Sequence, residues 1–210
     1  MSEDPETAAV TDKETLRRQV RAQRRSLARQ RDRGVDGEAI AAAVSALLDT
    51  LVLPPAGTGE YSAYGGQGCV AIYRSLPTEP PTKALAEMLH ARGVPVIVPE
   101  MLDDMDLDWH GLRTDGSEGP ALGLGAIGDA LLILTPALAV DHTGTRLGQG
   151  GGCYDRALAR RRPDAVLVAI VNDQEYAAWP LPRAAHDVRM NAVITPGLGL
   201  VAIPGAGSVG

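Results

Sequence analysis

The apolar segment Ala130–Leu134 constrains the fold more than any other part of this sequence. It is a continuous apolar run closed by Thr135 and Pro136, and such a run is typical of a strand buried on both faces. A strand of this kind needs helices packed on each side of its sheet. The segment therefore favours an α/β fold built on a parallel sheet.

Strand-like and helix-like segments alternate along the rest of the chain. Helices are expected from Thr11 onward, where Glu14 completes a capping box, and at Glu38–Leu51, Lys83–Arg92 and Tyr154–Arg162. Strands are expected at Val70–Tyr73, Val94–Val98, Ala130–Leu134, Val166–Val171 and Asn191–Thr195. This order predicts a single-domain layered sandwich with a central, mostly parallel sheet flanked by helices, which is Rossmann-like. Residues 100–128 have weak periodicity and are expected to form a long functional excursion.

The chain of 210 residues suits one domain. We expect a disordered lead at residues 1–10, a catalytic domain at 11–197 and a loose tail at 198–210 with at most one short extended piece. The polar start does not resemble a secretory signal, and no apolar run approaches membrane-spanning length. Two cysteines are too few for a disulfide framework or a zinc site, so a cytoplasmic protein is expected.

Positive charge is concentrated near the start of a chain whose formal net charge is -6. Residues 11–33 hold nine Lys or Arg against three acidic residues, so the remainder is strongly acidic. That distribution argues against general nucleic-acid binding. A charge run is usually a solvated helix face, but Lys13 and Arg17 lie one turn apart and could instead clamp a phosphate.

The glycine-rich stretch Arg146–Arg156 reads R-L-G-Q-G-G-G-C-Y-D-R. Its glycines can take positive φ, so that successive backbone N–H groups converge on one anion. The helix expected next would add the positive end of its dipole. A flexible linker is the alternative, but this stretch lies between an apolar strand and a helix and is charged at both ends. Arg146 offers a side chain that is always positively charged, and Asp155 offers a metal ligand. A phosphate group with its magnesium ion is therefore the favoured ligand of this stretch.

Several motifs occur together in an order that resembles the 5-formyltetrahydrofolate cyclo-ligase family. They are Asp141, Gly144, the glycine stretch from Arg146, Gln174, L-P at Leu181 and Pro182, H-D at His186 and Asp187, and V-I-T at Val193–Thr195. The resemblance runs from Lys13 to Thr195. It implies an α/β enzyme that uses ATP and Mg²⁺ to convert 5-formyltetrahydrofolate into 5,10-methenyltetrahydrofolate, as a monomer or weak homodimer without nucleic-acid or membrane partners.

The resemblance also implies roles for particular residues. Arg146 and Tyr154 would be catalytic. The ATP-binding residues would be Lys13, Arg17, Arg146, Leu147, Gly148, Gln149, Gly150, Gly151, Gly152, Cys153, Tyr154 and Asp155. The substrate would be held by Glu79, Met105, Trp109 and Gln174, with Glu79 accepting from the reduced pterin. Asp155 and Asp187 would hold the metal, with Asp141 as a weaker third candidate and His186 as a residue that orients substrate.

Two of these roles have plainer alternatives, and three positions depart from the family pattern. Glu79 could be a solvent-facing turn residue and Trp109 an ordinary core residue. Cys153 stands where the family usually has an aromatic residue, Val140 replaces the usual Phe, and Leu131 replaces a common Asp. None of the three removes a charge that the mechanism needs. They do leave open a non-catalytic folate- or nucleotide-binding paralogue that kept the fold.

Overall fold

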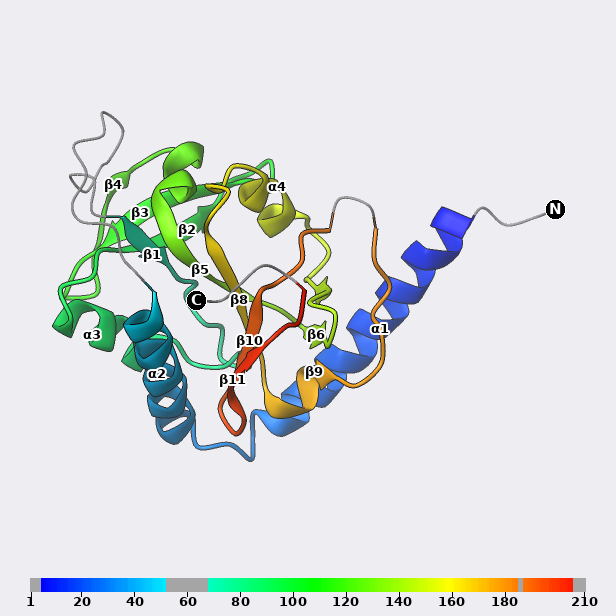
Figure 1. Cartoon of the computed structure of the whole chain (residues 1–210). Coiled ribbons are helices and arrows are strands. Elements are labelled where there is room, and N and C mark those ends of the chain that lie inside the picture. Colours follow the sequence, from blue (N-terminus) through cyan, green and yellow to red (C-terminus); the bar gives the residue numbers. More distant parts are fainter. Residues whose placement is uncertain (1–4, 52–67, 185–186, 206–210) are drawn as a thin grey trace.

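An eight-stranded sheet runs through the structure, a computed structural model that describes residues 5–51, 68–184 and 187–205, with the backbone alone described for 5–12 (Figure 1). The strand order is β11-β10-β8-β5-β1-β2-β3-β4. The strands are β1 (Cys69–Ala71), β2 (Val96–Met101), β3 (Leu107–Leu112), β4 (Glu118–Ala121), β5 (Ala130–Pro136), β8 (Val166–Ile170), β10 (Ala192–Thr195) and β11 (Gly199–Ala202). The five from β10 to β2 are parallel, which confirms the mostly parallel sheet.

Strand β5 lies in the middle of the parallel part, as its apolar run predicts. It pairs with β1 and β8, with Leu132 opposite both Val70 and Val166. Ile133 packs into one apolar cluster, whereas Leu132 and Leu134 pack into the cluster on the opposite face. The strand is therefore buried on both faces.

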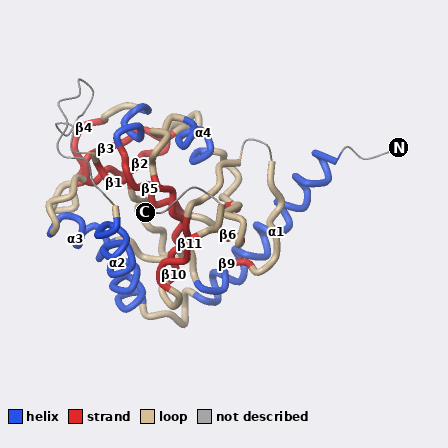
Figure 2. Tube along the Cα trace, in the orientation of Figure 1, coloured by secondary structure: helices blue, strands red, loops and turns tan. Residues whose placement is uncertain are grey.

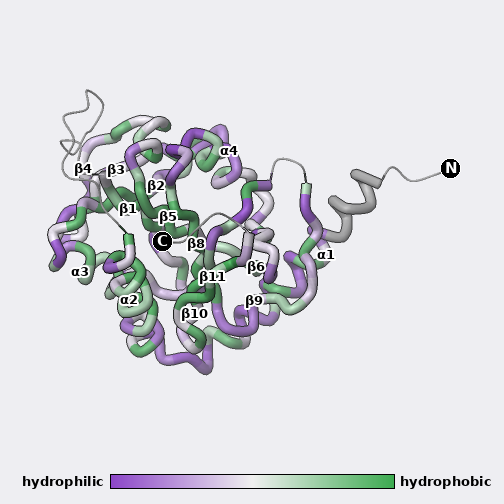
Figure 3. Tube along the Cα trace, viewed as in Figure 1, coloured by the Kyte–Doolittle hydropathy of each residue, from purple (hydrophilic) through white to green (hydrophobic). Residues whose placement is uncertain are grey.

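Helices cover the two faces of the sheet (Figure 2). Helices α2 (Arg33–Thr50) and α3 (Lys83–Ala91) bury Ile40, Val44 and Leu85 on one face. The other face is covered by α4 (Cys153–Ala159) and a 3₁₀ helix, η1 (Leu124–Asp129). Colouring by hydropathy shows the apolar residues gathered along the central strands between these layers (Figure 3).

A small second sheet, in the order β7-β6-β9, lies beside the main one. It contains β6 (Ala139–Asp141), β7 (Arg146–Leu147) and β9 (Tyr176–Ala177), and the short 3₁₀ helix η2 (Asp173–Glu175) precedes β9. Helix α1 (Pro5–Leu27) packs on this sheet through Leu16 and Val20 (Figure 1). The small sheet and α1 thus hold the chain that follows β5 up to the start of the glycine loop, residues 148–152.

Two helix starts differ from expectation. Helix α1 begins at Pro5 rather than Thr11, so the helix includes residues 5–10. Proline suits this position because its fixed φ fits the first helical turn and the missing N–H would have no partner there. Helix α2 begins at Arg33 rather than Glu38, because Asp32 accepts hydrogen bonds from the backbone N–H groups of Gly34 and Val35.

Two segments expected to be irregular contain strands. Within residues 100–128, β3 and β4 extend the sheet in antiparallel fashion from β2. In the expected loose tail, β11 pairs antiparallel with β10, which agrees with the one short extended piece foreseen there. Among the described residues, no helix is long and apolar enough to cross a membrane.

Gly144 offers a stability test of the turn between β6 and β7. Its φ is +81°, and a Cβ there would lie 2.5 Å from the carbonyl oxygen of Met190. We expect Gly144→Ala to lower the free energy of unfolding by about 2–3 kcal/mol, because it adds a backbone clash to the left-handed conformation. Gly116 has φ +82° and open space around its Cβ position, so Gly116→Ala should cost only about 1 kcal/mol. Urea unfolding of both variants measures the difference, and equal losses would contradict the clash.

Candidate active site

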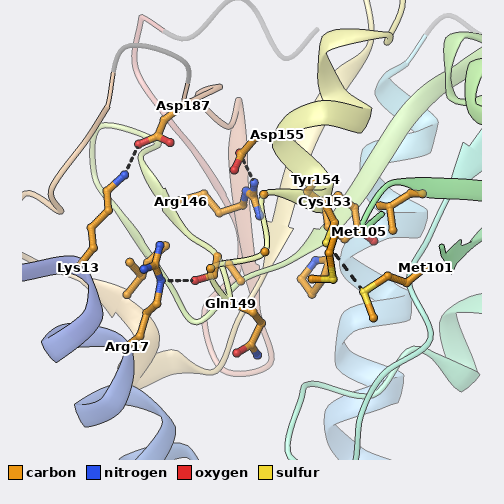
Figure 4. A pocket seen from close by; sticks show the side chains of 18 of the residues that line it. Lys13, Arg17, Met101, Met105, Arg146, Gln149, Cys153, Tyr154, Asp155 and Asp187 are labelled. Atoms are coloured by element: carbon orange, nitrogen blue, oxygen red, sulfur yellow. Dashed lines mark hydrogen bonds and ion pairs between the residues drawn. The ribbon is translucent and has the colours of Figure 1, made fainter. Parts of the chain in front are cut away.

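A pocket of about 530 Å³ opens between α1, the glycine loop and the turn that joins β2 to β3 (Figure 4). Of the described residues that the sequence assigned to a site, all but Trp109, Gln174 and Asp141 line it. These are Lys13, Arg17, Glu79, Met105, Arg146, Leu147, Gly148, Gln149, Gly150, Gly151, Gly152, Cys153, Tyr154, Asp155 and Asp187. The sequence did not indicate Leu76, Met101, Leu107, Pro136 and Ala137, which also line it. Residues far apart in the chain thus meet around one cavity of the size typical for small ligands.

The glycine loop leads from β7 into α4 along one wall of this pocket. Gly150 has φ +109° and Gly152 has φ +69°, both in the left-handed region that side chains disfavour. Gly152 also occupies the N-cap position of α4. The glycines at these two positions therefore allow the sharp turns that bring the loop to the cavity.

Helix α1 holds this loop with arginine side chains. Arg17 donates from Nε to the carbonyl oxygen of Gly148 at 3.0 Å. Arg21 donates from Nη2 to the carbonyl oxygen of Gln149 at 2.6 Å and from Nε to its side-chain oxygen at 3.0 Å. The sequence did not single out Arg21, although its spacing of four from Arg17 places both on one helix face. Two arginines of this helix face, Arg17 and Arg21, thus bind the glycine loop instead of pointing only into solvent.

Arg146 is nearly buried and lies between an acid and an aromatic ring. Its Nη2 is 2.6 Å from Oδ1 of Asp155, and its guanidinium carbon lies 5.6 Å from the centre of the Tyr154 ring. Its Nε and the Tyr154 hydroxyl are both buried, and neither has a hydrogen-bond partner among the described residues. Burial raises the pKa of Tyr154, so this hydroxyl keeps its proton at neutral pH. The Nε of Arg146 and the hydroxyl of Tyr154 are therefore two buried donors that could bind an acceptor atom of a ligand.

The two carboxylates assigned to the metal line the pocket, and each is paired with a cation. Asp155 pairs with Arg146, and Asp187 lies 2.6 Å from Nζ of Lys13 and accepts from the backbone N–H of Ala184. No group of three or more His, Cys, Asp or Glu side chains that could hold a metal occurs among the described residues. This donor set suits Mg²⁺, which is commonly bound by one or two carboxylates together with phosphate oxygens.

Asp141, the third metal candidate, lies outside the pocket. It is fully buried and accepts from the backbone N–H groups of Thr143, Thr145 and Leu181. Burial pushes its pKa up, but these hydrogen bonds outweigh burial, and the pKa lies below its ordinary value. Its lone pairs are used within the small sheet, so Asp141 is a structural residue.

Glu79 is buried at the pocket wall rather than exposed on a turn. Its Oε2 accepts from the backbone N–H of Leu76 at 3.0 Å, and its Oε1 lies 3.9 Å from Nη1 of Arg24. Burial raises the pKa of Glu79, while the Leu76 hydrogen bond and the Arg24 charge oppose that rise. The sequence does not distinguish Arg24, because it lies within a run of arginines expected to face solvent.

Trp109 and Gln174 do not line the pocket. Trp109 lies on β3, two residues beyond Leu107 and under α4 and η1, and it is fully buried in the core. It cannot stack on a ligand there, so the core alternative is correct. Gln174 is exposed, whereas its neighbour Glu175 points inward to Arg24. Adjacent side chains of a one-turn 3₁₀ helix point in different directions, which explains the difference. His186 lies outside the described residues.

Sulfur atoms line the wall where the family usually has a ring. Cys153 Sγ lies 3.9 Å from Met101 Sδ, and Met105 also lines the pocket (Figure 4). Val140 is a core residue of the small sheet, and Leu131 covers Gly68. Of the three departures, only Cys153 therefore changes the pocket surface.

The sequence matches one protein family over most of its length. The model of the 5-formyltetrahydrofolate cyclo-ligase family matches residues 9–196. The chain belongs to this family. It is also 36% identical over 149 residues to a 5-formyltetrahydrofolate cyclo-ligase of Mycolicibacterium smegmatis, which is 64% of this chain and 76% of that protein.

Two solved structures show the same fold as this cyclo-ligase family member. The 5,10-methenyltetrahydrofolate synthetase of Aquifex aeolicus superposes with a TM-score of 0.66 at 20% identity, covering 93% of this chain and 95% of that one. The synthetase of Mycoplasma pneumoniae superposes with a TM-score of 0.59 at 16% identity, covering 87% and 97%. The chain thus shares the overall fold of these two solved structures.

Proposed function

We propose that this protein is an ATP- and Mg²⁺-dependent ligase that converts 5-formyltetrahydrofolate into 5,10-methenyltetrahydrofolate and releases ADP and phosphate. The supporting observation is the composition of the single pocket described above. Its α1 and glycine-loop side carries Lys13, Arg17 and Arg146, and another part of its wall carries Glu79 with apolar side chains. A nucleotide and a reduced pterin need these two kinds of surface side by side.

The basic part suits the phosphate chain. The glycine loop offers backbone N–H groups, and the three basic side chains offer charge. Asp155 and Asp187 would hold Mg²⁺ together with phosphate oxygens, and the ion would neutralise phosphate charge. As ligands bind, Lys13 and Arg146 would turn from these carboxylates towards phosphate. Before the ligands bind, these two ion pairs would neutralise the charges of the four side chains.

The other part of the pocket suits the pterin. Glu79 can accept hydrogen bonds from ring N–H groups, and Leu76, Leu107 and Met105 offer apolar surface. A thioether adapts to the face of a flat ring, so the methionines can take the place of an aromatic wall. The formyl group would then lie towards Tyr154 and Arg146.

The reaction requires positioning and charge neutralisation. The formyl oxygen of the substrate accepts the γ-phosphoryl group as its bond to ADP breaks. The neighbouring amine nitrogen then attacks the formyl carbon and gives up its proton, and phosphate leaves with the former formyl oxygen and takes that proton. Arg146 stabilises the charge that develops on the transferring group, and its unpaired Nε together with the Tyr154 hydroxyl can donate to an oxygen there. No side chain needs to become a covalent nucleophile.

An absorbance assay tests this function. Purified protein mixed with 5-formyltetrahydrofolate and Mg-ATP should gain the near-ultraviolet absorbance of the methenyl product, with one ADP formed for each product molecule. Absence of both signals over the range of neutral pH would overturn the proposal. Tight folate or nucleotide binding without ADP would instead support a non-catalytic paralogue, the alternative favoured by the sulfur atom of Cys153 at the wall.

Substitution of Asp187 tests the metal assignment. Asp187→Asn should raise the Mg²⁺ concentration needed for half-maximal rate by about tenfold or more, because it removes a negative ligand. Initial rates against free Mg²⁺ at saturating ATP measure the change. Asp164→Asn is the matched control, since Asp164 is exposed and pairs only locally with Arg162. An unchanged Mg²⁺ requirement in Asp187→Asn would contradict the assignment.

A further inference from the structure

Arg24 is a buried arginine whose guanidinium is fixed by hydrogen bonds through Nε and Nη2, whereas Nη1 faces the Glu79 carboxylate. Its side chain is 3% exposed. Nε and Nη2 each lie 2.6 Å from a different carboxylate oxygen of Glu175, and Nη2 also donates to the carbonyl oxygen of Ala137. These contacts fix the plane of the guanidinium. Within the described part of the chain Nη1 has no hydrogen-bond partner, and it lies 3.9 Å from Glu79 Oε1.

This arrangement exceeds what the docking of α1 requires. A buried charged pair is costly to desolvate and adds little stability compared with apolar residues of similar volume. Helix α1 already packs through Leu16 and Val20. The unpaired Nη1 is directed at a carboxylate of the pocket wall, whereas Arg24 itself does not line the pocket.

The charges around Glu79 come from several elements. Arg24 on α1 and Arg33 on α2 are the cations, and Arg33 donates to the backbone carbonyl of Glu79 at 2.7 Å. Glu175 on η2 is the neighbouring anion. Tyr73 and Tyr154 also face Glu79, but burial raises the pKa of each, so both stay neutral. Arg24 is thus the cation whose guanidinium faces the Glu79 carboxylate.

We infer that Arg24 is a positioning residue of the folate site, which keeps Glu79 ionised and in place at the pocket wall. The inference rests on the proposed role of Glu79 in holding the pterin. An ionised Glu79 accepts hydrogen bonds through both oxygens, whereas a protonated one presents a donor to the ring N–H groups and is mismatched. Because Glu79 is buried, it needs a nearby cation to stay ionised at neutral pH. Arg24 supplies that cation without occupying the cavity.

The experiment compares two variants. Arg24→Gln alone would leave Glu175 buried with the backbone N–H of Asn172 but without a cation, so we use Glu175→Gln as the background and add Arg24→Gln to it. The two proteins then differ only at position 24, where Gln is neutral and shorter than Arg. Arg25→Gln is the control, because Arg25 is an exposed arginine at the next position of α1. Arg24→Lys in the Glu175→Gln background restores the charge.

The first readout does not depend on catalysis. Carbon-13 NMR of glutamate-labelled protein follows the Glu79 carboxyl carbon, identified by its loss in Glu79→Gln. Adding Arg24→Gln should move the midpoint of its titration to higher pH, by about tenfold in proton affinity. Arg24→Lys should return it towards the background value, and Arg25→Gln should leave it at the wild-type value. An unmoved midpoint in a folded double variant would overturn the inference.

The second readout is kinetic. At pH 7, adding Arg24→Gln should lower kcat/KM for the folate about three- to tenfold, with recovery at higher pH and a KM for ATP within about twofold. A merely structural role would lower both substrates' kcat/KM equally at every pH, which would overturn the inference. Inactive wild-type protein would refute the proposed function, whereas the carboxyl titration would still decide the role of Arg24.

Discussion

Replacing Arg146 with alanine is expected to lower kcat by about a hundred- to a thousandfold, with a much smaller change in folate binding. The reason is that in the proposed reaction charge develops on the transferring phosphoryl group, and Arg146 lines the pocket with a buried Nε that has no hydrogen-bond partner among the described residues. The guanidinium carbon lies 5.6 Å from the centre of the Tyr154 ring, and this contact would keep Arg146 at the pocket wall when it turns from Asp155 towards phosphate. Steady-state kinetics together with folate titration by calorimetry separates the two effects.

Two companion variants sharpen this result. Arg146→Lys keeps the charge but loses the planar guanidinium, so it should recover only part of the lost rate. Arg161→Ala removes an arginine beyond the end of α4 that binds the carbonyl of Leu158, and it should leave kcat unchanged. Equal losses of kcat and folate affinity in Arg146→Ala would show a general binding role instead.

Replacing Asp141 with alanine is expected to cost about 3–5 kcal/mol of unfolding free energy, the largest stability effect that we expect of a single substitution here. Asp141 accepts three backbone hydrogen bonds and one from the Thr143 hydroxyl, all in a fully buried position. Without the carboxylate these donors lose their partner inside the protein. Guanidinium unfolding measures the loss.

The Asp141 substitution also separates a structural role from a metal-binding one. Because the folded-state pKa of Asp141 lies below its ordinary value, its stabilisation is present above the ordinary carboxyl pKa and is lost as pH falls through the folded-state value. Asp141→Asn keeps the shape and should be less damaging. The Mg²⁺ requirement of a folded Asp141→Asn protein should match wild type, and a raised requirement would show that Asp141 does bind the metal.

The fold was predictable where burial leaves a strong pattern. Strands β5 and β8 are apolar on both faces, and their sequences show it directly. Strands β3 and β4 contain partly exposed residues, so their polar content resembles a loop. Strands β7 and β9 have two residues each, which is too short for any periodicity.

The part of the site that consists of residues close together in the sequence was predictable. The glycine loop carries its own signal, because the positive φ angles of Gly150 and Gly152 favour glycine. The contact of Arg24 with Glu79 joins α1 to a distant turn, and nothing in a run of arginines distinguishes the buried one from its exposed neighbours. The depth of Trp109 likewise depends on η1 and α4, which cover it only in the folded protein.

Helix α1 contacts the glycine loop and Asp187 across separations of 128 to 174 residues. During synthesis the arginines of α1 can therefore meet the loop only after more than a hundred further residues have been made. Its apolar contact with the body is small, so we expect α1 to open and reclose as a sub-global unit while the main sheet stays intact. Each opening would remove Lys13, Arg17 and Arg24 together. Bound nucleotide should suppress these events, which couples occupancy of the pocket to the protection of one helix against hydrogen exchange.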